Sequence, residues 1–245
     1  MKAKFFSACA VALMMNTAAT VAADETIYTT AVADASRPQA DRDRDALRMP
    51  EQTLAFSGVK PGMVVGELFP GGGYFTRQLS EIVGPNGKVY GMENLKWGVP
   101  DDQKMAAEPG RGNVTIIPTK FSEIQPPEKL DLFWITQNYH DLHIPKYGTV
   151  DMPAFNKRVY DALKPGGIYF ILDHQANPGT TEADIARLHR IEKAQVIREV
   201  TAAGFKLVGE GDFLHRADDD HTRSIFDKAI QGHTDQYALK FQKPM

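Results

Sequence analysis

The segment from Glu67 to Gly73 joins a carboxylate to three consecutive glycines, Gly71, Gly72 and Gly73, directly after an apolar run. Successive glycines let a backbone approach a ligand closely, and a helix that begins after them offers free N–H groups. At the carboxyl edge of a parallel sheet, such a loop lies where ligands bind. The sequence therefore predicts a ligand cradle here, although a tight turn that needs glycine only for its backbone is the simpler alternative.

A second carboxylate, Glu93, ends the apolar run 88–92, about twenty residues beyond the glycines. A carboxylate at this place can accept hydrogen bonds from both hydroxyls of an adenosine ribose, so the same spacing suits a dinucleotide or S-adenosylmethionine. Three features favour S-adenosylmethionine: the acid before the glycines, Thr76 in place of the third dinucleotide-fingerprint glycine, and two further strands after the fifth.

Polar side chains capable of acid–base chemistry follow the apolar run 132–136. Asn138 and Tyr139 are predicted to orient cofactor and substrate, and His140 to take a proton from the acceptor, because an imidazole titrates near neutral pH. Asp141 is predicted to hold the tautomer of that imidazole. The alternative is that His140 only caps the strand or bonds to backbone.

Other histidines extend this set. His174 follows the run 168–173 and is a second candidate for binding the acceptor. His189 lies in the next helical stretch, where it either reaches over the site or, as we expect, sits on the surface. No pair of histidines has a metal-ligand spacing such as His-x-x-x-His with a carboxylate base, so no metal is predicted.

Short apolar runs alternate with amphipathic stretches along most of the chain, which predicts an α/β fold built from right-handed βαβ units around a parallel sheet. The period-two pattern near the C-terminus predicts a last strand that inserts antiparallel. Expected strands are 64–68, 88–92, 113–118, 132–136, 168–173, 205–208 and 236–241; expected helices are 37–57, 75–83, 153–163 and 182–203.

Residues 1–23 have the pattern of an export signal, with Lys2 and Lys4 before an apolar run and small residues around Ala23. The run is shorter than the ~20 residues that span a bilayer, so no stable membrane anchor is expected. We predict cleavage after Ala23, a flexible lead over 24–36, one domain over 37–245, and a periplasmic or secreted location. Cys9 is the only cysteine, so the mature chain has no thiol for disulfides, metal binding or nucleophilic catalysis.

The formal net charge is −3, and loss of the two signal lysines makes it −5. Phosphate backbones are bound by clustered Lys and Arg, and no basic stripe is present, so nucleic acid is not expected as a partner. The alternating charges over 41–45 predict a solvated, ion-paired helix face.

Four segments together resemble class I S-adenosylmethionine-dependent methyltransferases: 59–62 (Val-Lys-Pro-Gly), 67–76, 84–90 and 163–167 (Leu-Lys-Pro-Gly-Gly). From about Arg37 onward the chain is also similar to exported bacterial predicted methyltransferases, which share an acid-x-aromatic-Pro-Gly-Gly-Gly-aromatic-aromatic-Thr loop and an Asn-Tyr-His-Asp segment. The resemblance implies a Rossmann-like fold with a mostly parallel seven-stranded sheet, helices on both faces and an antiparallel C-terminal strand.

The resemblance also implies roles for single residues. Glu67 and the three glycines would line the methionine end of the cofactor, and Glu93 would bind its ribose. Two positions depart from the family pattern: Phe69 replaces the usual first glycine of the loop, and Lys120 or Phe121 stands where many members have an acid facing the adenine. Phe121 is predicted to stack on the purine instead.

The sequence thus predicts a methyltransferase that uses S-adenosylmethionine on an unidentified small-molecule or cell-envelope acceptor. A ligand-binding protein that kept the fold without catalysis is the alternative, because a chain exported unfolded cannot carry a cytoplasmic cofactor with it. A nicotinamide-dependent oxidoreductase is disfavoured by the missing third glycine.

Overall fold

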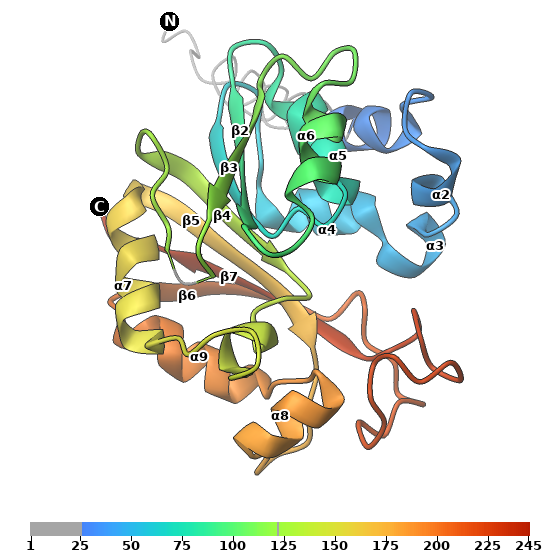
Figure 1. Cartoon of the computed structure of the whole chain (residues 1–245), viewed down its shortest axis with the longest axis vertical. Coiled ribbons are helices and arrows are strands. Elements are labelled where there is room, and N and C mark those ends of the chain that lie inside the picture. Colours follow the sequence, from blue (N-terminus) through green and yellow to red (C-terminus); the bar gives the residue numbers. More distant parts are fainter. Residues whose placement is uncertain (1–25, 122) are drawn as a thin grey trace, which may run out of the picture.

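A seven-stranded sheet in the order β3-β2-β1-β4-β5-β7-β6 runs through the computed structural model, which describes residues 26–121 and 123–245 (Figure 1). The predicted signal, 1–23, lies outside the described residues. Strands β1 to β5 pair in parallel, and β7 lies antiparallel between β5 and β6, which confirms the predicted fold class. The strands are β1 (Val64–Leu68), β2 (Lys88–Asn94), β3 (Val114–Thr119), β4 (Leu130–Thr136), β5 (Leu163–His174), β6 (Lys206–Gly211) and β7 (Gln236–Gln242).

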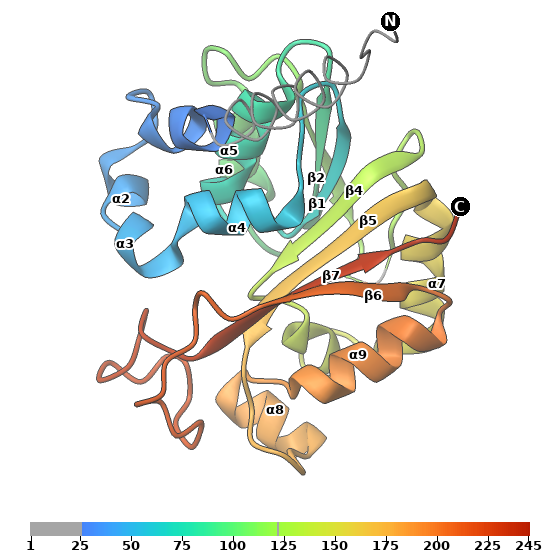
Figure 2. The same ribbon diagram turned by 180° about the vertical axis from the view of Figure 1, so that it is seen from behind.

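Helices cover both faces of the sheet, and the central strands are therefore apolar on both sides (Figure 2). Along β4, Leu132 and Trp134 belong to the core beneath α4 (Pro50–Ser57), α5 (Tyr74–Val83) and α6 (Val99–Ala106). The alternate residues Phe133 and Ile135 belong to the core beneath α7 (Met152–Ala162) and α9 (Lys193–Ala202). No helix among the described residues is long and apolar enough to cross a membrane.

Two predicted helices are interrupted by single residues with left-handed backbone. The region 37–57 forms α2 (Gln39–Arg42), α3 (Asp45–Arg48) and α4, with Met49 at φ 43° between the last two. The region 182–203 forms α8 (Glu182–Leu188) and α9, because His189 adopts φ 56° and ends α8. Helix α6 and the short 3-10 helix η1 (His140–His143) were not predicted.

The flexible lead predicted over 24–36 is wrong for the part that the structure describes. Residues 26–33 are helical, and Tyr28 and Ala31 are buried in the core that contains Leu54 and Val59. The hydroxyl of Tyr28 also donates a hydrogen bond to the carbonyl of Val59, 3.0 Å away. Burial of these apolar groups outweighs the polar composition that suggested a disordered segment.

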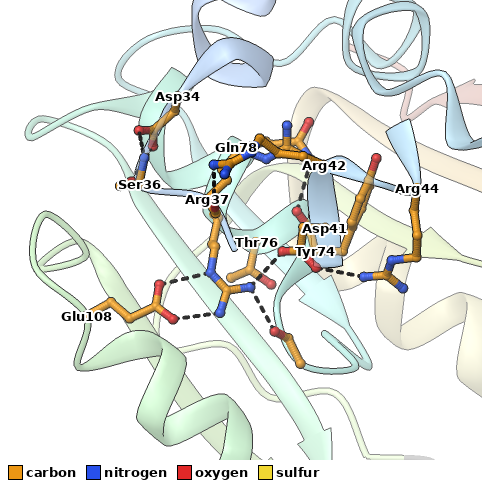
Figure 3. A network of polar contacts seen from close by, with 12 residues as sticks. Asp34, Ser36, Arg37, Asp41, Arg42, Arg44, Tyr74, Thr76, Gln78 and Glu108 are labelled. Carbon is orange, nitrogen blue, oxygen red and sulfur yellow. Dashed lines mark hydrogen bonds and ion pairs between the residues drawn. The ribbon is translucent and has the colours of Figure 1, made fainter. Parts of the chain in front are cut away.

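The charge run 41–45 is only partly a solvated face, because Asp41 joins a largely buried polar network (Figure 3) and Asp45 forms an ion pair with the buried Arg37 at 2.7 Å. Asp41 accepts hydrogen bonds from Arg44 and Arg77, at 2.8 and 3.0 Å. Arg77 also binds Glu108 through two nitrogens, at 2.9 and 2.6 Å, and donates to the carbonyl of Gly72, 2.9 Å away. The N-terminal helices are thereby tied to the glycine loop.

We expect Arg77→Met to lower the free energy of unfolding by about 3 kcal/mol, because it leaves the buried Asp41 carboxylate without this partner. Urea denaturation measures the change. Lys104→Met is the matched control: its ion pair with Asp101 is exposed at both ends, so its loss should cost less than about 1 kcal/mol. Equal effects of the two substitutions would contradict a structural role for the Arg77 network.

Candidate active site

A cavity of about 310 Å³ opens at the carboxyl ends of β1, β4 and β5, the edge where ligands bind in this class of sheet. It brings together six predicted site residues: Glu67, Gly71, Asn138, His140, Asp141 and His174. The other lining residues are Arg44, Arg48, Phe69, Pro70, Tyr74, Phe75, Thr136, Gln137, Tyr147, His189, Ile225 and Phe226.

The glycine loop follows a left-handed path that few side chains tolerate. The φ angles of Gly71, Gly72 and Gly73 are 58°, 84° and 88°, and Phe69 has φ 55°. Phe69 therefore has the backbone conformation that favours glycine, the residue that the resemblance implies at this position, and it bears the strain of a bulky side chain there.

Three of the left-handed residues that are not glycine line the cavity: Phe69, Gln137 and His189. Each such conformation costs on the order of 1–3 kcal/mol and persists only where the surrounding structure holds it. Such a concentration around one cavity is typical of functional sites.

A carboxyl group and a guanidinium face the cavity from two elements. Glu67, at the end of β1, is buried and accepts a hydrogen bond from Thr76 at 2.6 Å; burial, with the nearby Asp102, raises its pKa to about 8. Arg48 of α3 donates to Gln137 at 2.8 Å and lies over the Tyr74 ring at 4.2 Å, and burial lowers its pKa to about 10. An acid and a guanidinium are thus available for a ligand that carries both charges.

Glu93 does not line the cavity. Its buried carboxylate accepts the N–H of Asn94 at 2.6 Å, and burial together with the adjacent Asp102 raises its pKa to about 8. Asp102 also accepts the N–H of Gly72 at 2.9 Å, so the acid pair supports the glycine loop from behind. The loop is also packed closely at Gly73, where a Cβ would lie only 2.5 Å from the side chain of Met105.

Phe121 is likewise part of the packing in this structure. Its ring stacks on Phe69, with centroids 5.2 Å apart and planes at 18°, and meets Trp97 edge-on at 5.3 Å. The positions predicted for ribose and purine are therefore occupied by contacts within the chain.

His140 is held by three neighbours. Its backbone N–H and its Nδ1 lie 2.8 and 2.7 Å from the two carboxylate oxygens of Asp173, and its Nε2 lies 3.3 Å from both Asp141 and His189. Burial opposes the charged imidazole, but Asp173 and Asp141 raise its pKa to about 10. A histidine with this pKa carries its proton at neutral pH, so the geometry disagrees with the predicted role of His140 as proton acceptor.

Asp141 and His174 line the same cavity as His140. Burial opposes ionisation of Asp141, but His140, His189 and Asn138 hold its pKa well below the ordinary value. Burial lowers the pKa of His174 to about 3, and its neutral ring lies 2.8 Å from the hydroxyl of Thr234. His174 can therefore orient an acceptor by hydrogen bonding.

Tyr139 points away from the cavity, contrary to its predicted role. It is fully buried; its hydroxyl donates to Glu199 at 2.8 Å and accepts from Asn156 at 2.9 Å. This side chain connects η1 with α7 and α9.

The cavity also contains residues that were not predicted to belong to the site. His189, expected on the surface, is buried against Phe226, whose ring is edge-on at 4.8 Å. Phe226 and Ile225 come from the segment between β6 and β7, and the N–H of Ile225 bonds to the carbonyl of Leu188. Arg48 and Gln137 are 89 positions apart in the chain, so no local spacing could have paired them.

A family profile described as "Methyltransferase domain" matches residues 59–236, which is more than half of the chain. The chain belongs to this methyltransferase-domain family. This match confirms the predicted class of enzyme. No curated protein sequence matches significantly.

Solved structures with this fold confirm the architecture of the methyltransferase domain. A SAM-dependent methyltransferase from Aquifex aeolicus has a TM-score of 0.58 and 19% identity, over 79% of this chain and 88% of its own. Fibrillarin from Aeropyrum pernix, with natively bound S-adenosyl-L-methionine, has a TM-score of 0.50 and 16% identity, over 78% and 73%. The [4+2]-cyclase SpnF has a TM-score of 0.59 and 17% identity, over 84% and 81%, so the fold is similar also to a protein named for a different reaction.

We expect Glu67→Gln to stabilise the methyltransferase domain increasingly as the pH rises from 5 to 8. The pKa of Glu67 is raised from 4.5 to about 8, so between these values the unfolded chain releases a proton that the folded chain retains. The wild type therefore loses stability as the pH rises through this window, and the amide removes that loss. The difference between the two unfolding free energies should reach a few kcal/mol at pH 8, on the order given by one pKa unit per 1.4 kcal/mol. If the difference in unfolding free energy between the wild type and Glu67→Gln is the same at pH 5 and at pH 8, the burial of a protonated Glu67 is contradicted.

We expect Gly73→Ala to destabilise the protein by more than Gly72→Ala. Both positions have left-handed backbone, so each alanine costs about 1 kcal/mol in strain. Only the Cβ at position 73 would collide, at 2.5 Å from Met105, whereas position 72 has open space. The melting temperatures of the two variants, each compared with the wild type, measure the difference. Equal decreases in melting temperature would show that the side chain of Met105 moves aside without an energetic penalty.

Proposed function

We propose that this protein is a methyltransferase that uses S-adenosylmethionine on a small-molecule or cell-envelope acceptor. One observation carries the proposal: a single cavity is lined both by Glu67 and Gly71 of the cofactor loop and by polar residues that end or follow β4 and β5. Its volume, about 310 Å³, is at the lower end of the range for ligand pockets.

The residues fit the methionine end of the cofactor. That end carries an ammonium and a carboxylate, and the cavity offers the Glu67 carboxyl and the Arg48 guanidinium. Within the described residues, neither Glu67 nor Arg48 forms an ion pair with another side chain. Both groups are therefore available to a ligand. The bound cofactor would supply a methyl group on a sulfonium, which is already a good leaving group.

The chain's part in such a reaction is mainly alignment, because methyl transfer needs acceptor, methyl group and sulfur in line. Asn138 and His174 line the same cavity as Glu67 and are the residues proposed to orient the acceptor. Glu93 and Phe121 remain proposed contacts for ribose and purine, which requires Phe121 to leave its stack on Phe69.

The cell-envelope part of the proposal rests on the signal pattern of residues 1–23 and on the similarity to exported bacterial proteins. N-terminal sequencing of the protein recovered from the cell envelope tests it, with a chain that starts at Asp24 as the expected result. An intact N-terminus in the cytosolic fraction would contradict it.

The second candidate function is ligand binding without turnover. It is favoured by the packing of Glu93 and Phe121 within the fold and by the absence of a deprotonated base at His140. Transfer of labelled methyl groups to envelope extracts separates the two functions: a labelled product supports the methyltransferase, and binding without product supports the alternative.

We expect S-adenosylmethionine or S-adenosylhomocysteine to raise the melting temperature of the purified protein, and NAD to leave it unchanged. At 100 times its dissociation constant, a ligand adds about 2.7 kcal/mol of stability. Glu67→Gln should weaken binding about 10-fold or more, because an amide cannot take the negative charge that pairs with the ammonium of the ligand. Glu81→Gln, an exposed acid on α5 outside the cavity, should bind as the wild type does. No shift with either sulfur compound would reject the proposal.

A further inference from the structure

Two imidazoles and one carboxylate meet at the wall of the cavity where η1 lies against the end of α8. His140 Nε2 lies 3.3 Å from Asp141 Oδ1 and 3.3 Å from His189 Nδ1, and the last two atoms are 3.2 Å apart. All three residues are buried. Within the described part of the chain, no other three histidine, cysteine or acidic side chains are grouped so that they could hold one metal ion.

The nearly equilateral triangle has the size that a bound metal imposes on its ligands. Nitrogen and oxygen ligands lie about 2.1 Å from a first-row divalent ion. Two such ligands are then about 3.4 Å apart in a tetrahedral site and about 3.0 Å apart on one face of an octahedral site. The observed separations of 3.2 to 3.3 Å fall between these values.

The orientation of Asp141 favours an ion over a simple hydrogen-bonded cluster. Its Oδ1 is buried and has no hydrogen-bond partner among the described residues, although both imidazole nitrogens are near. Its other oxygen accepts a hydrogen bond from Asn138 at 2.9 Å. The two imidazoles thus interact with Asp141 Oδ1 through charge rather than through well-aligned hydrogen bonds, and a cation at the centre of the triangle would give this buried oxygen a direct partner.

A carboxylate orients the imidazole of His140 as in many metal sites. Asp173 lies 2.7 Å from His140 Nδ1, which leaves Nε2 to face the triangle. Carboxylate–histidine pairs of this kind fix the ring and raise the basicity of metal-ligating histidines. His189 reaches the triangle only because it takes the left-handed conformation that ends α8.

We propose that His140, Asp141 and His189 bind one divalent first-row transition metal ion, which displaces the proton that His140 Nε2 carries in the metal-free protein. Two nitrogens and one carboxylate oxygen favour Zn²⁺ or Fe²⁺ over Mg²⁺ or Ca²⁺, which prefer all-oxygen sites. All three ligands line the cavity, so the remaining coordination positions face it. If the proposed methyl transfer is correct, these positions hold an oxygen or nitrogen of the acceptor; the metal site itself does not depend on that function.

Metal titration of the untagged full chain tests the site. After treatment with a chelator, the protein is titrated with CoCl₂ by visible absorption and with ZnCl₂ by calorimetry, without S-adenosylmethionine; MgCl₂ is the hard-cation comparison. We expect one Co²⁺ per chain with absorption bands of a low-coordinate site, stronger binding of Zn²⁺ than of Mg²⁺, and a higher melting temperature with Zn²⁺.

Variants separate this site from adventitious binding. His189→Ala and Asp141→Asn should weaken Zn²⁺ binding by about 100-fold or more, and Asp173→Asn by about 10- to 100-fold. His215→Ala is the matched control, because its ring contacts Asp235 at 2.9 Å outside the triangle, and it should bind as the wild type does. Circular dichroism checks that each variant is folded.

Wild-type protein that binds neither Co²⁺ nor Zn²⁺, or folded His189→Ala that binds Zn²⁺ as tightly as the wild type, would overturn the metal site. Protein that fails these tests but is stabilised by S-adenosylmethionine would leave the proposed function intact. Protein that binds metal but neither sulfur compound would reject the methyltransferase proposal while keeping the metal site.

Discussion

The carboxylate of Asp173 fixes the geometry of the whole site. It is fully buried at the end of β5, and it accepts hydrogen bonds from the backbone N–H groups of His140 and His174, at 2.8 and 2.7 Å, while it contacts the His140 ring. A buried carboxylate must be satisfied by such partners, so the start of η1 is tied to β5. The orientation of His140, and with it the triangle that includes Asp141, follows from this one group.

The parts of the fold that could be predicted from the sequence are those set by local pattern. The apolar runs of β1, β2 and β4 and the glycines after β1 are each recognisable within a few residues, and the structure places them as expected. The interruption at His189 was not predictable, because left-handed backbone is uncommon outside glycine. For this reason His189 was expected on the surface, whereas it lines the cavity.

Site residues were predictable only where their partners are near in sequence. Asn138, His140 and Asp141 follow one strand, and all three line the cavity. Glu93 and Phe121 were assigned to a ligand because their actual partners, Asp102 and Trp97, lie in or beside the unpredicted helix α6. Whether such a side chain meets a ligand or its own chain is decided by packing between distant segments, which spacing does not encode.

The position of β7 inside the sheet has a consequence for when the protein can fold. β7 pairs with both β5 and β6, yet it follows them in the chain and is separated from β6 by the segment that supplies Phe226. Neither neighbour can complete its hydrogen bonds until residues 236–242 are available, and such non-local pairing is slow to form. Docking of residues 236–242 between β5 and β6 is therefore expected to be a late step in the folding of the domain.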